Sequence, residues 1–148
     1  MRFEKYKILL GFVFLFTIYG CSIPTDFYIQ NHTKESKIIT IKYQGNIKNQ
    51  IENDSYGTFS FNYKNGIVNP KEFKRNKNLL SLNKTIIGDY KIEIVLPASS
   101  TTRIEKTHNF GWSNWSIDNI KIDDQEVNIK DIQAKSIKIK DDNVYKIE

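Results

Sequence analysis

The sequence has few of the residues that build disulfide, metal or Gly- and Pro-rich structures. Its 148 residues include one Cys, three Pro and seven Gly. A single Cys excludes an internal disulfide and a cysteine-based zinc cluster, and so little Pro and Gly excludes collagen-like and Pro-rich linker classes. The two histidines, His32 and His108, lie in no metal-ligand pattern, and the sequence has no GxSxG, P-loop or GxGxxG. We therefore expect no enzymatic activity, no metal and no non-covalent cofactor.

The chain also has no strong excess of charge of one sign. The net charge is +5, and basic and acidic residues are interspersed along the chain. This balance is too mild and too mixed for a nucleic-acid-binding surface, so nucleic acid is not an expected partner. The chain is 39% hydrophobic and 13% aromatic, a composition typical of a globular domain.

One long apolar run is present, at the N-terminus. Residues 8–20 read ILLGFVFLFTIYG without a charge, and three basic residues precede them. Thirteen helical residues span about 20 Å, whereas a bilayer core is roughly 30 Å thick. The run therefore predicts a secretory signal peptide over residues 1–20, with an uncleaved membrane span as an alternative.

The only cysteine follows this run directly, in Ile18-Tyr19-Gly20-Cys21. This arrangement resembles the lipobox of bacterial lipoproteins. The resemblance implies cleavage before Cys21, diacylglycerol on its thiol and a fatty acyl group on the new amine. Two or three acyl chains would anchor the protein stably to a membrane. An ordinary secretory signal with an incidental cysteine is the alternative.

Residues 21–26 would then be a lipidated cysteine with a short tether. By analogy with the sorting rule of many Gram-negative lipoproteins, Ser22 favours the outer membrane of the cell envelope. The following DFYIQNHTKESKIITIKY also looks like the start of small surface lipoproteins, with a strand, a polar turn and a second strand.

Residues 27–148 show the period-2 alternation of strands. The clearest case is Tyr90, Ile92, Ile94 and Leu96, which ends at Pro97. Seven to nine such strands predict one antiparallel β-sandwich domain of immunoglobulin-like or transthyretin-like topology, with a small β-barrel as the alternative.

Several connections are also predicted. We expect a polar loop over 45–57, a hairpin turn at Asn65-Gly66, and a small polar loop over 98–102. The C-terminal third reads as two hairpins, 120–132 and 137–147.

Two segments are candidate contact sites. Trp112, Asn114 and Trp115 lie close together, and exposed Trp rings stack on sugars; alternatively, the rings cap one end of the sandwich. The second segment lies within 70–78, where a short helical turn is possible. Its cations are Lys71, Lys74, Arg75 and Lys77. Near an anchored surface they would meet anionic phosphates at about 1 kcal/mol per cation, or else form a solvated loop.

These features predict a lipid-anchored protein of the bacterial cell envelope that acts as a non-catalytic binding, adhesion or assembly module. An envelope protein would bind at an unpaired strand edge. One alternative is a glycan-binding surface lipoprotein that uses Trp112 and Trp115. The other is a small envelope hydrolase, which would need a pocket uniting His108 with a carboxylate.

Overall fold

The computed structural model describes residues 22–108 and 117–148. The lipobox-like segment with Cys21 and the segment with Trp112, Asn114 and Trp115 lie outside these described residues. Among the residues that are described, no helix has the length and apolar character that crossing a bilayer requires.

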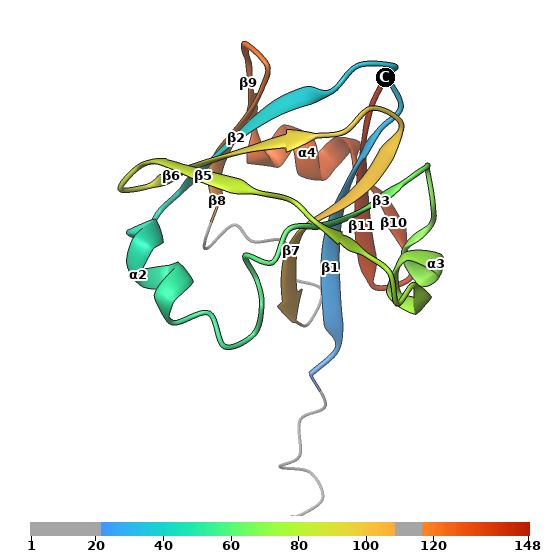
Figure 1. Ribbon diagram of the computed structural model, residues 1–148, viewed down its shortest axis with the longest axis horizontal. Helices are drawn as coiled ribbons and strands as arrows, with labels where there is room; N and C mark the ends of the chain where they lie inside the picture. The colour runs from blue at the N-terminus through green and yellow to red at the C-terminus, as the bar shows by residue number, and fades with distance from the viewer. Residues whose placement is uncertain (1–21, 109–116) are drawn as a thin grey trace, which may run out of the picture.

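The described residues form two β-sheets that cross at a steep angle and pack face to face (Figure 1). Sheet A has the order β10-β11-β1-β7-β3-β4, and sheet B the order β5-β6-β2-β8-β9. The strands of sheet A are β1 (Pro24–Asn31), β3 (Asn62–Asn65), β4 (Leu80–Ser81), β7 (Ser100–His108), β10 (Ile137–Ile139) and β11 (Asp142–Ile147). Those of sheet B are β2 (Lys37–Tyr43), β5 (Lys84–Gly88), β6 (Lys91–Leu96), β8 (Ile117–Ile122) and β9 (Gln125–Asn128).

The predicted β-sandwich is thereby confirmed. Within the described residues no strand pairing joins the two sheets, so they do not close into the alternative barrel. All strand pairs are antiparallel except β1 with β11, which run parallel from Phe27↔Asn143 to Asn31↔Ile147. As a consequence, β1 and β11 begin at the same end of sheet A.

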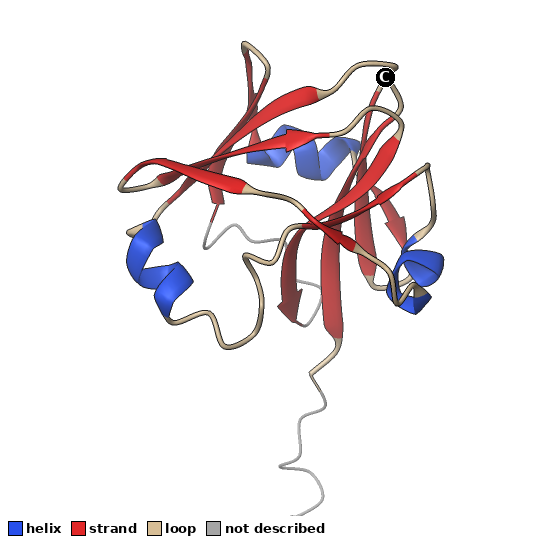
Figure 2. Ribbon diagram, in the orientation of Figure 1, coloured by secondary structure: helices blue, strands red, loops and turns tan. Residues whose placement is uncertain are grey.

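In the described part of the chain, three short helices connect the strands: α2 (Ile47–Glu52), α3 (Pro70–Arg75) and α4 (Ile129–Lys135) (Figure 2). Each begins after an asparagine whose side chain accepts a hydrogen bond from a first-turn N–H: Asn46, Asn69 and Asn128. The predicted loop 45–57 thus contains a helix. The second half of the predicted hairpin 120–132 is also helical, because its strand β9 ends at the cap Asn128.

The main core lies between the two sheets. It contains the alternating residues of β2 and β6, including Ile39, Ile41, Ile92 and Ile94, none more than 1% exposed. Helix α4 adds Ile132 from one end. The period-2 pattern that predicted these strands therefore identifies the face of each strand whose side chains are buried.

Strand β1 is buried on both faces. Ile29 points into the main core, whereas Tyr28 belongs to a second cluster with Val68, Phe73 and Val144. The rings of Tyr28 and Phe73 meet edge to face, with centroids 5.1 Å apart. Through Phe73, helix α3 is held against the outer face of sheet A.

Two of the predicted turns differ in the structure. Asn65-Gly66 closes no tight hairpin, because β3 pairs with β4 and β7; Gly66, at φ +94°, instead directs the chain toward α3. Ser100, Thr101 and Thr102, predicted as loop, are buried in β7. The turns β8–β9 and β10–β11 occur as predicted, with Asp123 and Lys140 at positive φ.

Candidate functional site

The basic segment that the sequence singled out forms helix α3 and one wall of a groove. The opposite wall is the turn between β10 and β11, and the cavity measures about 590 Å³. We call it the α3 groove. The cap Asn69 and the Pro70 that follows fix the start of the helix, and buried Phe73 orients it, so that Lys71, Lys74 and Arg75 line the groove.

A network of charged groups from three strands and α3 lies at the base of the α3 groove. Asp142 accepts hydrogen bonds from Lys74 Nζ at 2.7 and 2.8 Å and from the Asp26 N–H at 2.9 Å. Asp26 Oδ2 lies 3.7 Å from Lys74 Nζ and 3.8 Å from Arg103 Nη1. Both carboxylates are buried, and each has a cation beside it, as buried charges require.

Tyr28 completes this network. Its hydroxyl donates a hydrogen bond to Asp26 Oδ2 at 3.0 Å. Burial raises the pKa of Tyr28 far above its usual value of 10.0, and the neighbouring charges of Asp26 and Asp142 raise it further. Tyr28 is therefore a neutral donor at every physiological pH.

Three cations at the rim of the α3 groove remain available. Lys71, Arg75 and Lys140 are exposed and form no ion pair within the described residues, and the acidic residue beside them is Asp141. Lys77, the fourth predicted cation, does not line the groove. Lys140 was missed because it comes from a distant hairpin, and no local sequence signal links it to α3.

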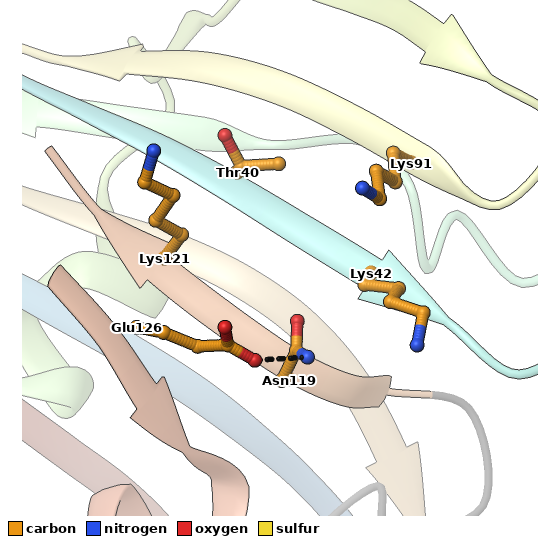
Figure 3. A pocket seen from close by; sticks show the side chains of 6 residues that line it. All are labelled: Thr40, Lys42, Lys91, Asn119, Lys121 and Glu126. Atoms are coloured by element: carbon orange, nitrogen blue, oxygen red, sulfur yellow. Dashed lines mark hydrogen bonds between the residues drawn. The ribbon is translucent and has the colours of Figure 1, made fainter. Parts of the chain in front are cut away.

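A second hollow, of about 290 Å³, lies on the outer face of sheet B (Figure 3). Asn119 donates to Glu126 Oε1 at 2.6 Å, Lys42 pairs with Asp118, and Lys121 lies 3.2 Å from Asp124. The amines of Lys42 and Lys121 point in opposite directions (Figure 3). These side chains therefore do not converge on a common ligand.

Strand β5 is an exposed edge of sheet B. All five of its residues are exposed, and it pairs with β6 alone among the described strands. Ile86 is 49% and Ile87 47% exposed. The other three edges are shorter or polar: β4 has two residues, β10 has three, and β9 reads QEVN. An unpaired edge with apolar side chains is suited to accept another strand.

The two histidines lie on the surface and far apart in the sequence. His32 Nε2 is 3.3 Å from Gln30 Oε1, and the His108 ring packs on Tyr56 with centroids 4.3 Å apart. Within residues 22–108 and 117–148, no three His, Cys, Asp or Glu side chains gather in a way that could hold a metal ion.

Comparison with known proteins gives no assignment: no family model, no curated protein and no solved structure matches this chain.

Proposed function

We propose that this chain is the precursor of a lipid-anchored bacterial envelope lipoprotein, and that its β-sandwich is a non-catalytic binding module. The lipobox-like Ile18-Tyr19-Gly20-Cys21 supports the anchor. Strand β1 begins at Pro24, so the tether from Cys21 to the folded domain is at most about 11 Å long. The domain would sit directly on the membrane, and Ser22 favours the outer one.

The observation that carries the binding role is the exposed edge of β5. An extended segment of an envelope protein placed beside β5 would pair with its free backbone groups, and its side chains would cover Ile86 and Ile87. Such strand addition needs no catalytic group. It also explains why two adjacent isoleucines remain half exposed on this edge.

Metabolic labelling tests the anchor. Cells that express the full chain are fed a tagged fatty acid, and their inner and outer membranes are separated by density. Wild type and the control Ser22→Ala should take up label, whereas Cys21→Ala should take up none and leave the membrane fraction. Equal labelling of wild type and Cys21→Ala would contradict the proposal. Label confined to the inner membrane would contradict the outer-membrane assignment alone.

Site-specific photocrosslinking in the envelope tests the edge. A photoreactive residue in place of Ile87 should give one adduct of defined mass, and Ile86→Lys should abolish it. The same probe in place of Gln125, on the polar edge β9, is the matched control. Adducts of equal yield at both edges, or an Ile87 adduct that survives Ile86→Lys, would show that β5 is not a specific binding edge.

A further inference from the structure

We propose that the α3 groove binds the phosphate headgroup of an anionic lipid in the membrane that holds the anchor. This inference rests on the proposed lipid anchor at Cys21. It assigns a ligand chemistry to a site that is separate from the β5 edge, since α3 packs on sheet A and β5 belongs to sheet B.

The charge of the α3 groove is the first argument. At its base, the carboxylates of Asp26 and Asp142 are matched by the cations of Lys74 and Arg103, so this network is close to neutral. The rim cations are therefore additional, and they outnumber the one rim carboxylate. A surplus of cations held at the mouth of a cavity attracts an anion.

The rim cations are Lys71 and Arg75 on α3 and Lys140 on the β10–β11 turn, and the rim carboxylate is Asp141. Because they come from two separate elements, they face the cavity from both walls. The guanidinium of Arg75 has the planar donor geometry that matches two oxygens of one phosphate.

The position of the α3 groove is the second argument. Asp26 donates its N–H to Asp142, a residue that lines the groove, and Asp26 is five residues after Cys21. Five extended residues reach at most about 18 Å. Since β1 and β11 run parallel, Asp142 at the start of β11 lies near the start of β1, and Figure 1 draws α3 beside this end of sheet A. A domain anchored through Cys21 would hold this groove within reach of the headgroups.

The lining of the groove is the third argument. Ile139 lines the groove beside the cations and is 37% exposed, so it adds apolar surface there. Contact with apolar surface does not stabilise a bound inorganic anion. A phosphodiester headgroup that carries the first carbons of its glycerol and acyl chains would contact both kinds of surface, which favours the lipid over a free phosphate.

Native mass spectrometry of the protein that cells make from the full sequence, extracted from their membranes in mild detergent, tests this assignment. The probes are phosphatidylglycerol, zwitterionic phosphatidylcholine and inorganic phosphate. We expect a phosphatidylglycerol adduct that exceeds the other two. Each cation near an anionic lipid is worth about 1 kcal/mol, or about fivefold in affinity. The double variant Lys71→Gln/Arg75→Gln should therefore bind phosphatidylglycerol about 30-fold more weakly.

The matched control is Lys48→Gln/Lys130→Gln, which removes two exposed cations outside the α3 groove and should bind like wild type. Equal binding by the two double variants, or equal binding of the two phospholipids, would overturn the assignment. Inorganic phosphate that binds as tightly as phosphatidylglycerol would overturn the membrane source and leave a free-anion site.

The same spectra keep the two proposals distinguishable. The intact mass reports whether Cys21 carries diacylglycerol. A lipidated chain without a Lys71-dependent adduct overturns the groove assignment alone. An unlipidated chain overturns the proposed anchor and, with it, the argument that the tether holds the groove at the headgroups.

Discussion

The contact of Lys74 with two buried aspartates should contribute strongly to the stability of the domain. Lys74 Nζ reaches both oxygens of Asp142 and lies 3.7 Å from Asp26, so it links α3 to strands β11 and β1. Replacing Lys74 by Met keeps most of the length of the side chain and removes its charge. The two carboxylates then stay buried, with Arg103 beside Asp26 as the remaining cation of the network.

The magnitude follows from the burial of the partners. Removing one partner of a fully buried ion pair costs about 3–5 kcal/mol. The side chains of Asp26 and Asp142 are 7% and 8% exposed, but that of Lys74 is 38% exposed, so water already weakens the pair. We therefore expect Lys74→Met to lower the free energy of unfolding by about 2–3 kcal/mol, below the full range. Asp142→Asn keeps an acceptor for the Asp26 N–H and should cost about 1–2 kcal/mol.

Urea unfolding followed by circular dichroism at neutral pH measures these values. The double variant Lys74→Met/Asp142→Asn should cost less than the sum of the two single changes by at least about 0.5 kcal/mol, because the two side chains share one interaction. Lys64→Met is the control. It breaks the pair with the 52% exposed Glu72 and should cost under about 1 kcal/mol. The reasoning would be refuted if Lys74→Met cost no more than Lys64→Met.

Three further predictions concern packing, ionisation and backbone geometry. Phe73→Ala should destabilise the domain by about 3 kcal/mol in urea unfolding, because this side chain is fully buried against Tyr28, whereas Phe73→Leu should cost under about 1.5 kcal/mol. Burial and, to a smaller extent, the charge of Glu105 raise the pKa of Tyr43 above 10.0, so above about pH 10 only the unfolded chain loses this proton and the stability of the domain should fall. Urea unfolding from pH 9 to 11 should show a shallower fall for Tyr43→Phe than for wild type, a difference of up to about 1.4 kcal/mol per pH unit. Gly66→Ala should cost about 1 kcal/mol of thermal stability through the positive φ of residue 66 alone, since an added Cβ meets no atom within 4 Å. The control is Gly88→Ala, and a Gly66→Ala variant as stable as this control would contradict the prediction.

Strand patterns were predictable from the sequence where one face of a strand is buried. Ile39 and Ile41 on β2, and Ile92 and Ile94 on β6, alternate with more polar or exposed residues, and the structure places them in the main core. The pattern is informative because neighbouring side chains of a strand point to opposite faces. Strand β1 gave a weaker signal, since α3 covers its outer face and Tyr28 and Gln30 are buried as well.

The short helices were harder to predict. Each of α2, α3 and α4 has six or seven residues, fewer than two full turns, so an apolar period of 3.6 is not established. The signal that was present is the asparagine before each helix, but this sequence contains fifteen asparagines, and most of them do not cap a helix.

The sequence alone determined the uncharged, apolar character of residues 8–20, the strand content and the cationic character of residues 71–77, because charge and short-range alternation are local properties. Only the tertiary structure decided that Lys140 joins Lys71 and Arg75 at one groove, and that Lys74 joins Asp26 to Asp142. These groups are separated by up to 116 positions, and they meet because β1 and β11 pair in parallel under α3. That pairing depends on which surfaces of the whole domain are buried together, which no local pattern specifies.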